Sequence, residues 1–275
     1  MMSMLHTIRP RTAMALGAAS LVGAIAFTWP LFAHPGSALI AHSTDAPWLM
    51  LLLVPLVLAV AIADIADGGM DAKSVAILGV LIAVVAALRP LGAGVAGLEP
   101  VWFVVILGGR AFGPAFGFAL GSLGVFASGL TTGGVGPWLP FQMLAAAWVG
   151  MGAALLPPLR GKAEVAMLAA YGFVVGLAVG TLLNLWFWPF TTGLPSQVAF
   201  VGGASVMELF HRLFAFTLLT SLGYDIPRAL LTAGVLVIAA APLLRALRRV
   251  KRRANFAATP TFEVAGAADV AAPTA

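Results

Sequence analysis

The segment TTGGVGPWLPFQ, residues 131–142, interrupts the longest uncharged part of the chain. No Asp, Glu, Lys or Arg occurs between residues 111 and 159. An apolar run of about 20 residues is enough to cross a bilayer as a helix, and this run is more than twice that length. Its glycines and prolines therefore predict a rigid turn between two membrane-spanning helices.

The composition of the whole chain is typical of a membrane protein. Of its 275 residues, 61% are hydrophobic and 9% are charged, whereas a soluble domain has roughly a quarter charged residues. The mean hydropathy is +1.03. Because the apolar runs lack strand-like alternation, and because lipid offers the backbone no hydrogen-bond partners, the sequence predicts an all-α integral membrane protein with a polytopic helical bundle.

Several kinds of site are excluded or disfavoured by the composition. The sequence has no cysteine, so it contains no disulfide, thiolate metal site or catalytic cysteine. His34 and His42 have no third ligand nearby in the sequence, and we expect no metal site. The net charge of +5 does not indicate nucleic-acid binding, because the basic residues lie at helix ends and in a cluster at 245–253. That pattern predicts contact with anionic lipid head groups.

Apolar segments predict eight spans along the chain. They cover residues 12–33, 47–65, 73–89, 99–109, 113–130, 141–158, 165–188 and 227–247. A ninth apolar stretch, 204–222, carries Glu208, His211 and Arg212 near its centre, where charge is costly in lipid. We expect these three residues to form a mutual ion pair on a wet helix face rather than a ligand site.

The positive-inside rule decides the position of residues 204–222. If this stretch does not cross and both termini are cytoplasmic, twelve of the fifteen Lys and Arg residues lie inside. The three outside are Arg89, Arg212 and Arg228. A crossing would move the basic tail outside, so we predict that 204–222 lies on or dips into the outer surface of the cell membrane.

The ends of the predicted bundle follow from local signals. In the last span, Asp225 suits an N-cap and Pro227 suits the first helical turn. The first apolar stretch follows two arginines, as in a signal peptide, but it is long for a signal core and no clean cleavage site follows, so we expect a retained helix. Residues 254–275 are rich in Ala, Pro and Thr and predict a disordered tail.

Three loops share the outer face in this topology, at 90–98, 129–140 and 189–226. Their glycines let the backbone approach a ligand closely, Trp138 offers a flat apolar face, and Gln142 offers a neutral donor and acceptor. This combination suits a ring-bearing molecule that is uncharged or weakly charged. The alternative is that Gly and Pro only end helices and that Trp138 only lies in the interfacial belt. The candidate binding residues are Arg89, Gly134, Gly136, Pro137, Trp138, Gln142, Asn184 and Trp188.

Other polar and small residues have two interpretations each. Arg89 could pair with a ligand carboxylate or phosphate, or extend to the interface. Asn184 could bind a ligand or bridge two helices. Gly79, Ala83 and Ala87 recur every four residues and allow a helix to approach closely, either from a partner or from within this chain.

Three segments resemble one family. They are AILGVLIAVVAALRPLGAG (76–94), GGVGPWLPFQMLAAAWVG (133–150) and TLLTSLGYDIPRAL (217–230). In this order they are similar to the substrate-binding S components of energy-coupling factor transporters, of the actinobacterial type. The resemblance covers roughly residues 73–253.

The resemblance implies three parts of the chain. Residues 1–66 form an N-terminal extension with two transmembrane helices, 67–253 form a six-helix S-component-like core, and 254–275 form a cytoplasmic tail. The extra N-terminal helices depart from the minimal pattern of the family.

The resemblance also implies a function, without enzymatic activity or a cofactor. The chain would capture a vitamin or related micronutrient from outside, with the three outer loops covering the pocket. A transmembrane coupling subunit and two cytoplasmic ATPases would drive uptake, and the face of Gly79, Ala83 and Ala87 would contact the coupling subunit. The sequence itself lacks an ATP site, because the Gly161–Lys162 pair has neither the upstream glycine nor the following Ser or Thr of a Walker A loop. A cobalamin-like cargo is slightly favoured over riboflavin or folate.

Two other classes of function compete. A stand-alone secondary transporter or channel normally needs a buried carboxylate or ion site at mid-membrane, and we expect none in the core spans. A membrane-embedded enzyme needs clustered His, Asp or Glu, or a serine with a base. Only Glu208, His211 and Arg212 approach that pattern, and they lack a nucleophile in register.

Overall fold

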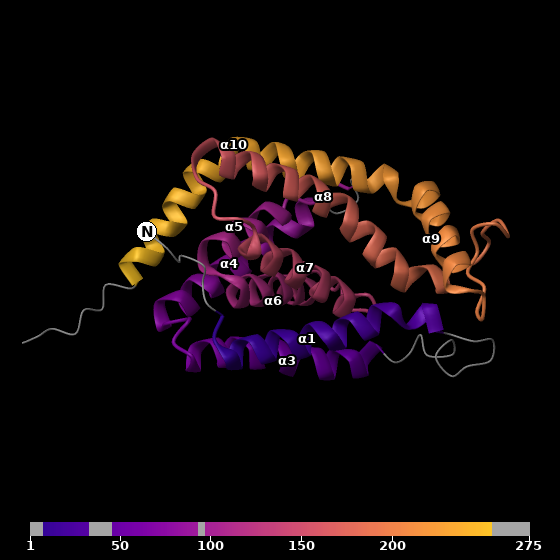
Figure 1. Ribbon diagram of the computed structural model, residues 1–275, viewed down its shortest axis with the longest axis horizontal. Coiled ribbons are helices and arrows are strands. Elements are labelled where there is room, and N and C mark those ends of the chain that lie inside the picture. The colour runs from indigo at the N-terminus through magenta and orange to yellow at the C-terminus, as the bar shows by residue number, and fades with distance from the viewer. Residues whose placement is uncertain (1–7, 33–45, 93–96, 255–275) are drawn as a thin grey trace, which may run out of the picture.

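The computed structural model describes residues 8–32, 46–92 and 97–254, and within these segments the chain is helical with no strand (Figure 1). The elements are α1 (Pro10–Thr28), η1 (Trp29–Phe32), α3 (Ala46–Ala66), α4 (Ala72–Leu88), η2 (Arg89–Gly92), α5 (Trp102–Phe112), α6 (Pro114–Thr132), α7 (Leu139–Leu155), α8 (Gly161–Phe187), η3 (Trp188–Phe190), α9 (Val206–Thr220) and α10 (Leu222–Ala254).

The chain is an all-α, polytopic membrane bundle. Five described helices are long and apolar enough to cross a bilayer: Pro10–Phe32, Ala72–Gly92, Pro114–Thr132, Gly161–Phe190 and Leu222–Arg252. Shorter apolar helices occupy Val54–Ala66, Trp102–Phe112 and Leu139–Leu155. Each of the eight predicted spans falls on one of these helices. Helix α9 has 15 residues and is not among them, which agrees with its predicted exclusion from the set of spans.

The helices form layers around α6 and α7. Helices α8 and α10 lie side by side along one edge, α1 and α3 lie along the opposite edge, and α4 to α7 lie between them (Figure 1). The bundle has two ends. We call one of them the loop end; it carries η2, residues 133–138, η3 and α9. We call the other the basic end; it carries the C-terminal half of the basic cluster at 245–253.

Glycine lets the central helices touch backbone to backbone. A Cβ added to Gly150 on α7 would lie 2.1 Å from the carbonyl oxygen of Gly117 on α6. A Cβ on Gly121 would lie 2.1 Å from the carbonyl oxygen of Ala146. Small residues at a helix crossing permit this close approach, and van der Waals packing then holds the helices together in lipid.

The N-terminal helices share the hydrophobic core of the remaining bundle. Gly23 on α1 lies against the side chains of Leu144 and Trp148 on α7. The indole N–H of Trp148 donates to Ser20 Oγ at 3.2 Å, and Phe27 contacts Phe141 edge to face with centroids 5.1 Å apart. Helix α3 packs on α6 and α7. The described part of the predicted extension is therefore integrated with the core helices.

Local capping sets the start of α4. Asp71 is its N-cap, with Oδ1 accepting a hydrogen bond from the Ser74 backbone N–H at 2.8 Å. Hydrogen bonds from the Ser74 side chain and backbone lower the pKa of Asp71 below its ordinary value.

The start of α10 differs from the prediction. The helix begins at Leu222, so Asp225 is not its N-cap and Pro227 lies inside the helix. The backbone N–H groups of Tyr224 and Asp225 both donate to Ser221 O, and the first turn therefore forms before Asp225. Pro227 is the sixth residue of the helix, so α10 lacks the backbone hydrogen bond to Gly223 O there. The Asp225 side chain is left to pair with Arg228 instead.

Candidate binding site

The connection between α6 and α7 is the tight turn that the glycines and prolines predict. Helix α6 ends at Gly133, whose φ of 68° is in the left-handed region that favours glycine. The N–H of Gly134 donates to Gly129 O at 2.9 Å, which closes the helix end. Helix α7 then starts at Leu139, with a proline in its first turn.

Trp138 folds back over this turn. Its indole N–H donates to Gly134 O at 3.2 Å, and a Cβ on Gly136 would lie 2.5 Å from the indole ring. Pro137 is half-buried between them. The Trp138 side chain remains 43% exposed. Trp138 thus stabilises its own turn. The exposed part of its ring is available to a ligand, whereas its N–H is already bonded to Gly134 O.

Arg89 and Gln142 meet at the loop end although 53 residues separate them. Arg89 Nη2 donates to Gln142 Oε1, and Arg89 Nη1 donates to Val125 O at 3.4 Å. Because Arg89 follows α4, Val125 lies on α6 and Gln142 lies on α7, this guanidinium joins three helices. It points into the bundle rather than only outward.

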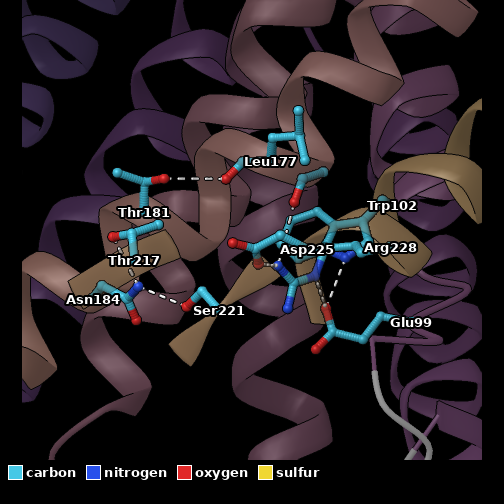
Figure 2. Close-up of polar contacts among 10 residues, drawn as sticks. Glu99, Trp102, Leu177, Thr181, Asn184, Thr217, Ser221, Asp225 and Arg228 are labelled. Atoms are coloured by element: carbon cyan, nitrogen blue, oxygen red, sulfur yellow. Dashed lines mark hydrogen bonds and ion pairs between the residues drawn. The ribbon is translucent and has the colours of Figure 1, made fainter. Parts of the chain in front are cut away.

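Asn184 bridges helices in this structure. Its amide Nδ2 donates to Thr217 Oγ1 at 3.1 Å and to Ser221 Oγ at 2.6 Å (Figure 2). It therefore joins α8 to the end of α9 and the start of α10. Of the two predicted interpretations, bridging is the one that the contacts show, and both amide hydrogens are engaged.

Trp188 is fully buried beneath the segment that follows η3. Its N–H donates to Val198 O at 2.7 Å, and its ring packs edge to face on Phe200 and beside Phe216 of α9. These residues form a small core separate from the main one. Trp188 thus holds η3, α9 and the connecting segment together.

The candidate residues therefore form two groups. Arg89, Gln142 and the turn at 134–138 lie around α4, α6 and α7, whereas Asn184 and Trp188 lie on α8 and η3. Within the described residues, no hydrogen bond joins the two groups. An aromatic contact bridges the two regions, between Phe141 and Trp186, whose ring centroids are 5.1 Å apart.

A buried charged cluster that the sequence did not predict also lies toward the loop end. Arg228 Nη1 donates to Asp225 Oδ1 at 2.6 Å, and Arg228 Nε donates to Glu99 Oε2 at 3.1 Å (Figure 2). Trp102 Nε1 donates to the same Glu99 oxygen at 2.8 Å. Asp225 is 2% and Arg228 7% exposed. Gly180 makes room, since a Cβ there would lie 1.9 Å from Asp225 Oδ1.

Asp225 is a buried carboxylate near the N-terminal end of α10, because the helix begins before it. It is the fourth residue of the helix and precedes the predicted span 227–247, so the expectation of no carboxylate at mid-membrane stays a prediction. The i,i+3 spacing of Asp225 and Arg228 was the available sequence signal. It predicts contact on a helix face once the helix is known to begin before Asp225.

The predicted ion pair on α9 is confirmed for Glu208 and Arg212. Arg212 Nη2 lies 2.8 Å from Glu208 Oε1 on the exposed side of the helix. Arg212 Nη1 also donates to Ser196 O at 2.6 Å, so it ties the preceding segment to α9. His211 is exposed beside them.

The basic end is closed by another charged cluster. Glu164 is buried and accepts hydrogen bonds from Arg110 at 2.7 Å and from Arg248 at 2.6 and 2.9 Å. Two residues of the basic cluster, Arg248 and Lys251, thus contact protein, since Lys251 donates to Ala111 O at 3.0 Å. Glu164 and Gly180 are about 24 Å apart along α8 at 1.5 Å per residue. That spacing is close to the thickness of a bilayer core.

The small-residue face of α4 is uncovered. Gly79, Ala83 and Ala87 are exposed, and a Cβ on Gly79 would meet nothing within 4 Å. The sequence left two interpretations of this face, contact with a partner or packing against another helix of this chain. The described contacts do not show the second. The face is open to lipid or to another helix.

The described residues contain no group of three His, Asp or Glu side chains that could hold a metal ion. A cavity of about 110 Å³ lies at the basic end, lined in part by Arg9, Thr12, Asp64 and Asp67. Thr12 Oγ1 donates to Asp67 Oδ2 at 2.9 Å, which joins α1 to the turn after α3. This cavity lies away from the predicted binding residues.

No protein-family model, curated protein or solved structure matches the chain.

Proposed function

We propose that this chain is the membrane-embedded substrate-binding subunit of an energy-coupling factor type importer for a vitamin or related micronutrient. The single observation that carries the proposal is the uncovered face of Gly79, Ala83 and Ala87 on α4. A membrane helix with small residues at four-residue intervals can pack closely on a partner helix, and this chain leaves that surface unused. The missing ATP site fits a subunit that depends on separate ATPases.

The loop end supplies the substrate site in this proposal. The turn at 133–138 is fixed by hydrogen bonds, Trp138 presents part of an aromatic ring, and Arg89 with Gln142 presents polar groups beside it. An aromatic surface next to a few placed polar groups is typical of small-molecule sites. By the positive-inside rule this end faces outward, and both termini are cytoplasmic. Among vitamins, we propose a cobalamin-like molecule as the slightly favoured cargo.

Replacing Ala83 by leucine tests the proposed role of α4. We expect co-purification with the coupling subunit and two ATPases, and ATP-driven uptake, to fall at least about tenfold, because a larger side chain separates the helices. Vitamin binding to the purified chain, followed by tryptophan fluorescence, should change less than about twofold.

Ala170→Leu is the matched control, since Ala170 is an exposed alanine on α8. It should leave both readouts unchanged. Normal assembly and uptake in Ala83→Leu would contradict the assignment of this face to a partner.

A stand-alone secondary transporter is the second candidate, and one observation favours it. The buried carboxylate of Asp225, paired with Arg228 inside α10, is the kind of intramembrane charge that ion-coupled carriers use. Uptake without the ATPases separates the two candidates. Accumulation at full rate in their absence would support the carrier and defeat the importer proposal.

A further inference from the structure

The polar residues at the ends of α4, α6 and α7 leave hydrogen-bond donors without acceptors. The Arg89 guanidinium has five N–H groups and uses Nη2 for Gln142 Oε1 and Nη1 for Val125 O. It has no carboxylate within ion-pair distance among the described residues. The other two arginines near the loop end are paired: Arg228 with Asp225 and Glu99, and Arg212 with Glu208.

Ser128 adds a second unused donor to this region. It is fully buried, and its hydroxyl has no hydrogen-bond partner in the described structure. Gly124 on α6 lies against Val85 on α4, with 2.7 Å between a Cβ on Gly124 and the Val85 side chain. Ser128 and Arg89 each lie one turn further along these helices, so the two residues lie at the same level of the bundle. The bond from Arg89 Nη1 to Val125 O brings the guanidinium to α6 within one turn of Ser128.

A buried hydroxyl without a partner costs free energy, and so does a partly buried guanidinium without a carboxylate in contact. Glu99 acts on Arg89 only from beyond ion-pair distance. The cost is removed when a group arrives that carries negative charge and accepts several hydrogen bonds. A carboxylate or a phosphate does both, and either forms short, strong bonds to a guanidinium. A neutral ring offers neither.

We propose that Arg89, Ser128 and Gln142 form a niche for an oxyanion, a carboxylate or a phosphate. Building on the proposed function, this oxyanion belongs to the imported molecule, so the importer selects an anionic cargo. Trp138 then contacts the cargo ring while the niche holds its charged group. The proposed cargo differs from the uncharged or weakly charged ligand expected from the loop sequence, and it follows the alternative in which Arg89 pairs with a ligand carboxylate or phosphate.

The niche is tested with the purified full-length chain in dodecyl maltoside, a detergent without phosphate. The readout is the midpoint of thermal unfolding by tryptophan fluorescence, titrated with acetate or inorganic phosphate against chloride at equal ionic strength. Wild type should show a saturable rise. Arg89→Gln should lose it, and Ser128→Ala should need about tenfold more anion, the loss expected for one hydrogen bond to a charged group.

Two matched controls accompany these variants. Ser122→Ala removes an equally buried and unpartnered hydroxyl from the same helix and should respond as wild type. Arg212→Gln removes an arginine from α9 and should also respond as wild type. Because Ser128 makes no hydrogen bond through its hydroxyl, Ser128→Ala keeps the test valid if Arg89→Gln does not fold. No saturable rise in wild type, or the same rise in Ser128→Ala, would overturn the niche.

Three further experiments complete the test. They distinguish an oxyanion of the cargo from one of a lipid head group, and they distinguish failure of the niche from failure of the proposed importer. Stabilisation by phosphatidylglycerol alone, dependent on Arg89, would assign the niche to a lipid head group and overturn the cargo interpretation. Matched probes, nicotinate against nicotinamide and pyridoxal 5′-phosphate against pyridoxal, test selection. Binding of the neutral members as tightly as the anionic ones, with both affinities unchanged in Ser128→Ala, would overturn the inference but keep the importer. An Arg89-dependent anion response with no vitamin bound and no ATPase-dependent uptake would keep the niche and contradict the importer.

Discussion

Replacing Gly150 by alanine is expected to lower the free energy of unfolding by about 3 kcal/mol, near the upper end of the range for overpacked cores. A Cβ at this position would lie 2.1 Å from Gly117 O and 2.6 Å from Gly117 C. Both atoms are helix backbone, so no side chain can rotate away and α6 and α7 must separate. Since these two helices form the centre of the bundle, the separation disturbs packing on both sides.

The measurement is reversible unfolding by sodium dodecyl sulfate in mixed micelles. Gly234→Ala is the control, because Gly234 lies in α10 and a Cβ there would meet nothing within 4 Å. Alanine favours a helix over glycine by about 1 kcal/mol, so this variant should be unchanged or slightly more stable. Equal stability of the two variants would contradict the backbone contact between α6 and α7.

Replacing Asp225 by asparagine should cost about 3 kcal/mol of unfolding free energy. The buried Arg228 guanidinium then loses its 2.6 Å pair with the buried Asp225 carboxylate and keeps only the partly exposed Glu99 as a charged partner. Removing one partner of a buried ion pair is costly. Asparagine keeps the shape that Gly180 accommodates, so steric effects are small. Glu208→Gln breaks the exposed pair with Arg212 and should cost less than about 1 kcal/mol.

The double variant Asp225→Leu, Arg228→Met distinguishes charge from packing. It removes both charges together, and it should recover part of the loss because apolar pairs often replace buried ion pairs without penalty. If Asp225→Asn were as mild as Glu208→Gln, the cluster would not be desolvated as the contacts indicate. A double variant less stable than Asp225→Asn would assign the effect to packing.

The helices could be predicted because membrane spans leave a signal that is local in sequence. Long uncharged runs fix where each helix lies, and Gly133 fixes the turn between α6 and α7. The start of α10 was missed because Pro227 suits a first helical turn, and hydropathy does not say how many residues precede it. Tertiary contact with Arg228 then uses the Asp225 carboxylate that the sequence assigned to capping.

The site was harder to predict because its contacts join distant residues. Arg89 and Gln142 were both named as candidates, but nothing local indicates that they bond to each other. Trp188 was named as a ligand contact, yet it is buried because the segment after η3 folds back over it, which leaves no periodic signal. Ser128 was not considered, since a serine in an apolar helix is ordinary until its lack of a partner is known.

The proposed importer requires the loop end to face outward, and single-cysteine labelling determines which side of the membrane it occupies. The chain has no cysteine, so Val135→Cys and Arg249→Cys each introduce one thiol, at exposed positions on opposite ends of the bundle. In intact cells an impermeant maleimide should modify position 135 and spare position 249 until the membrane is broken. Labelling of position 249 first, with position 135 protected, would contradict an outward-facing binding site.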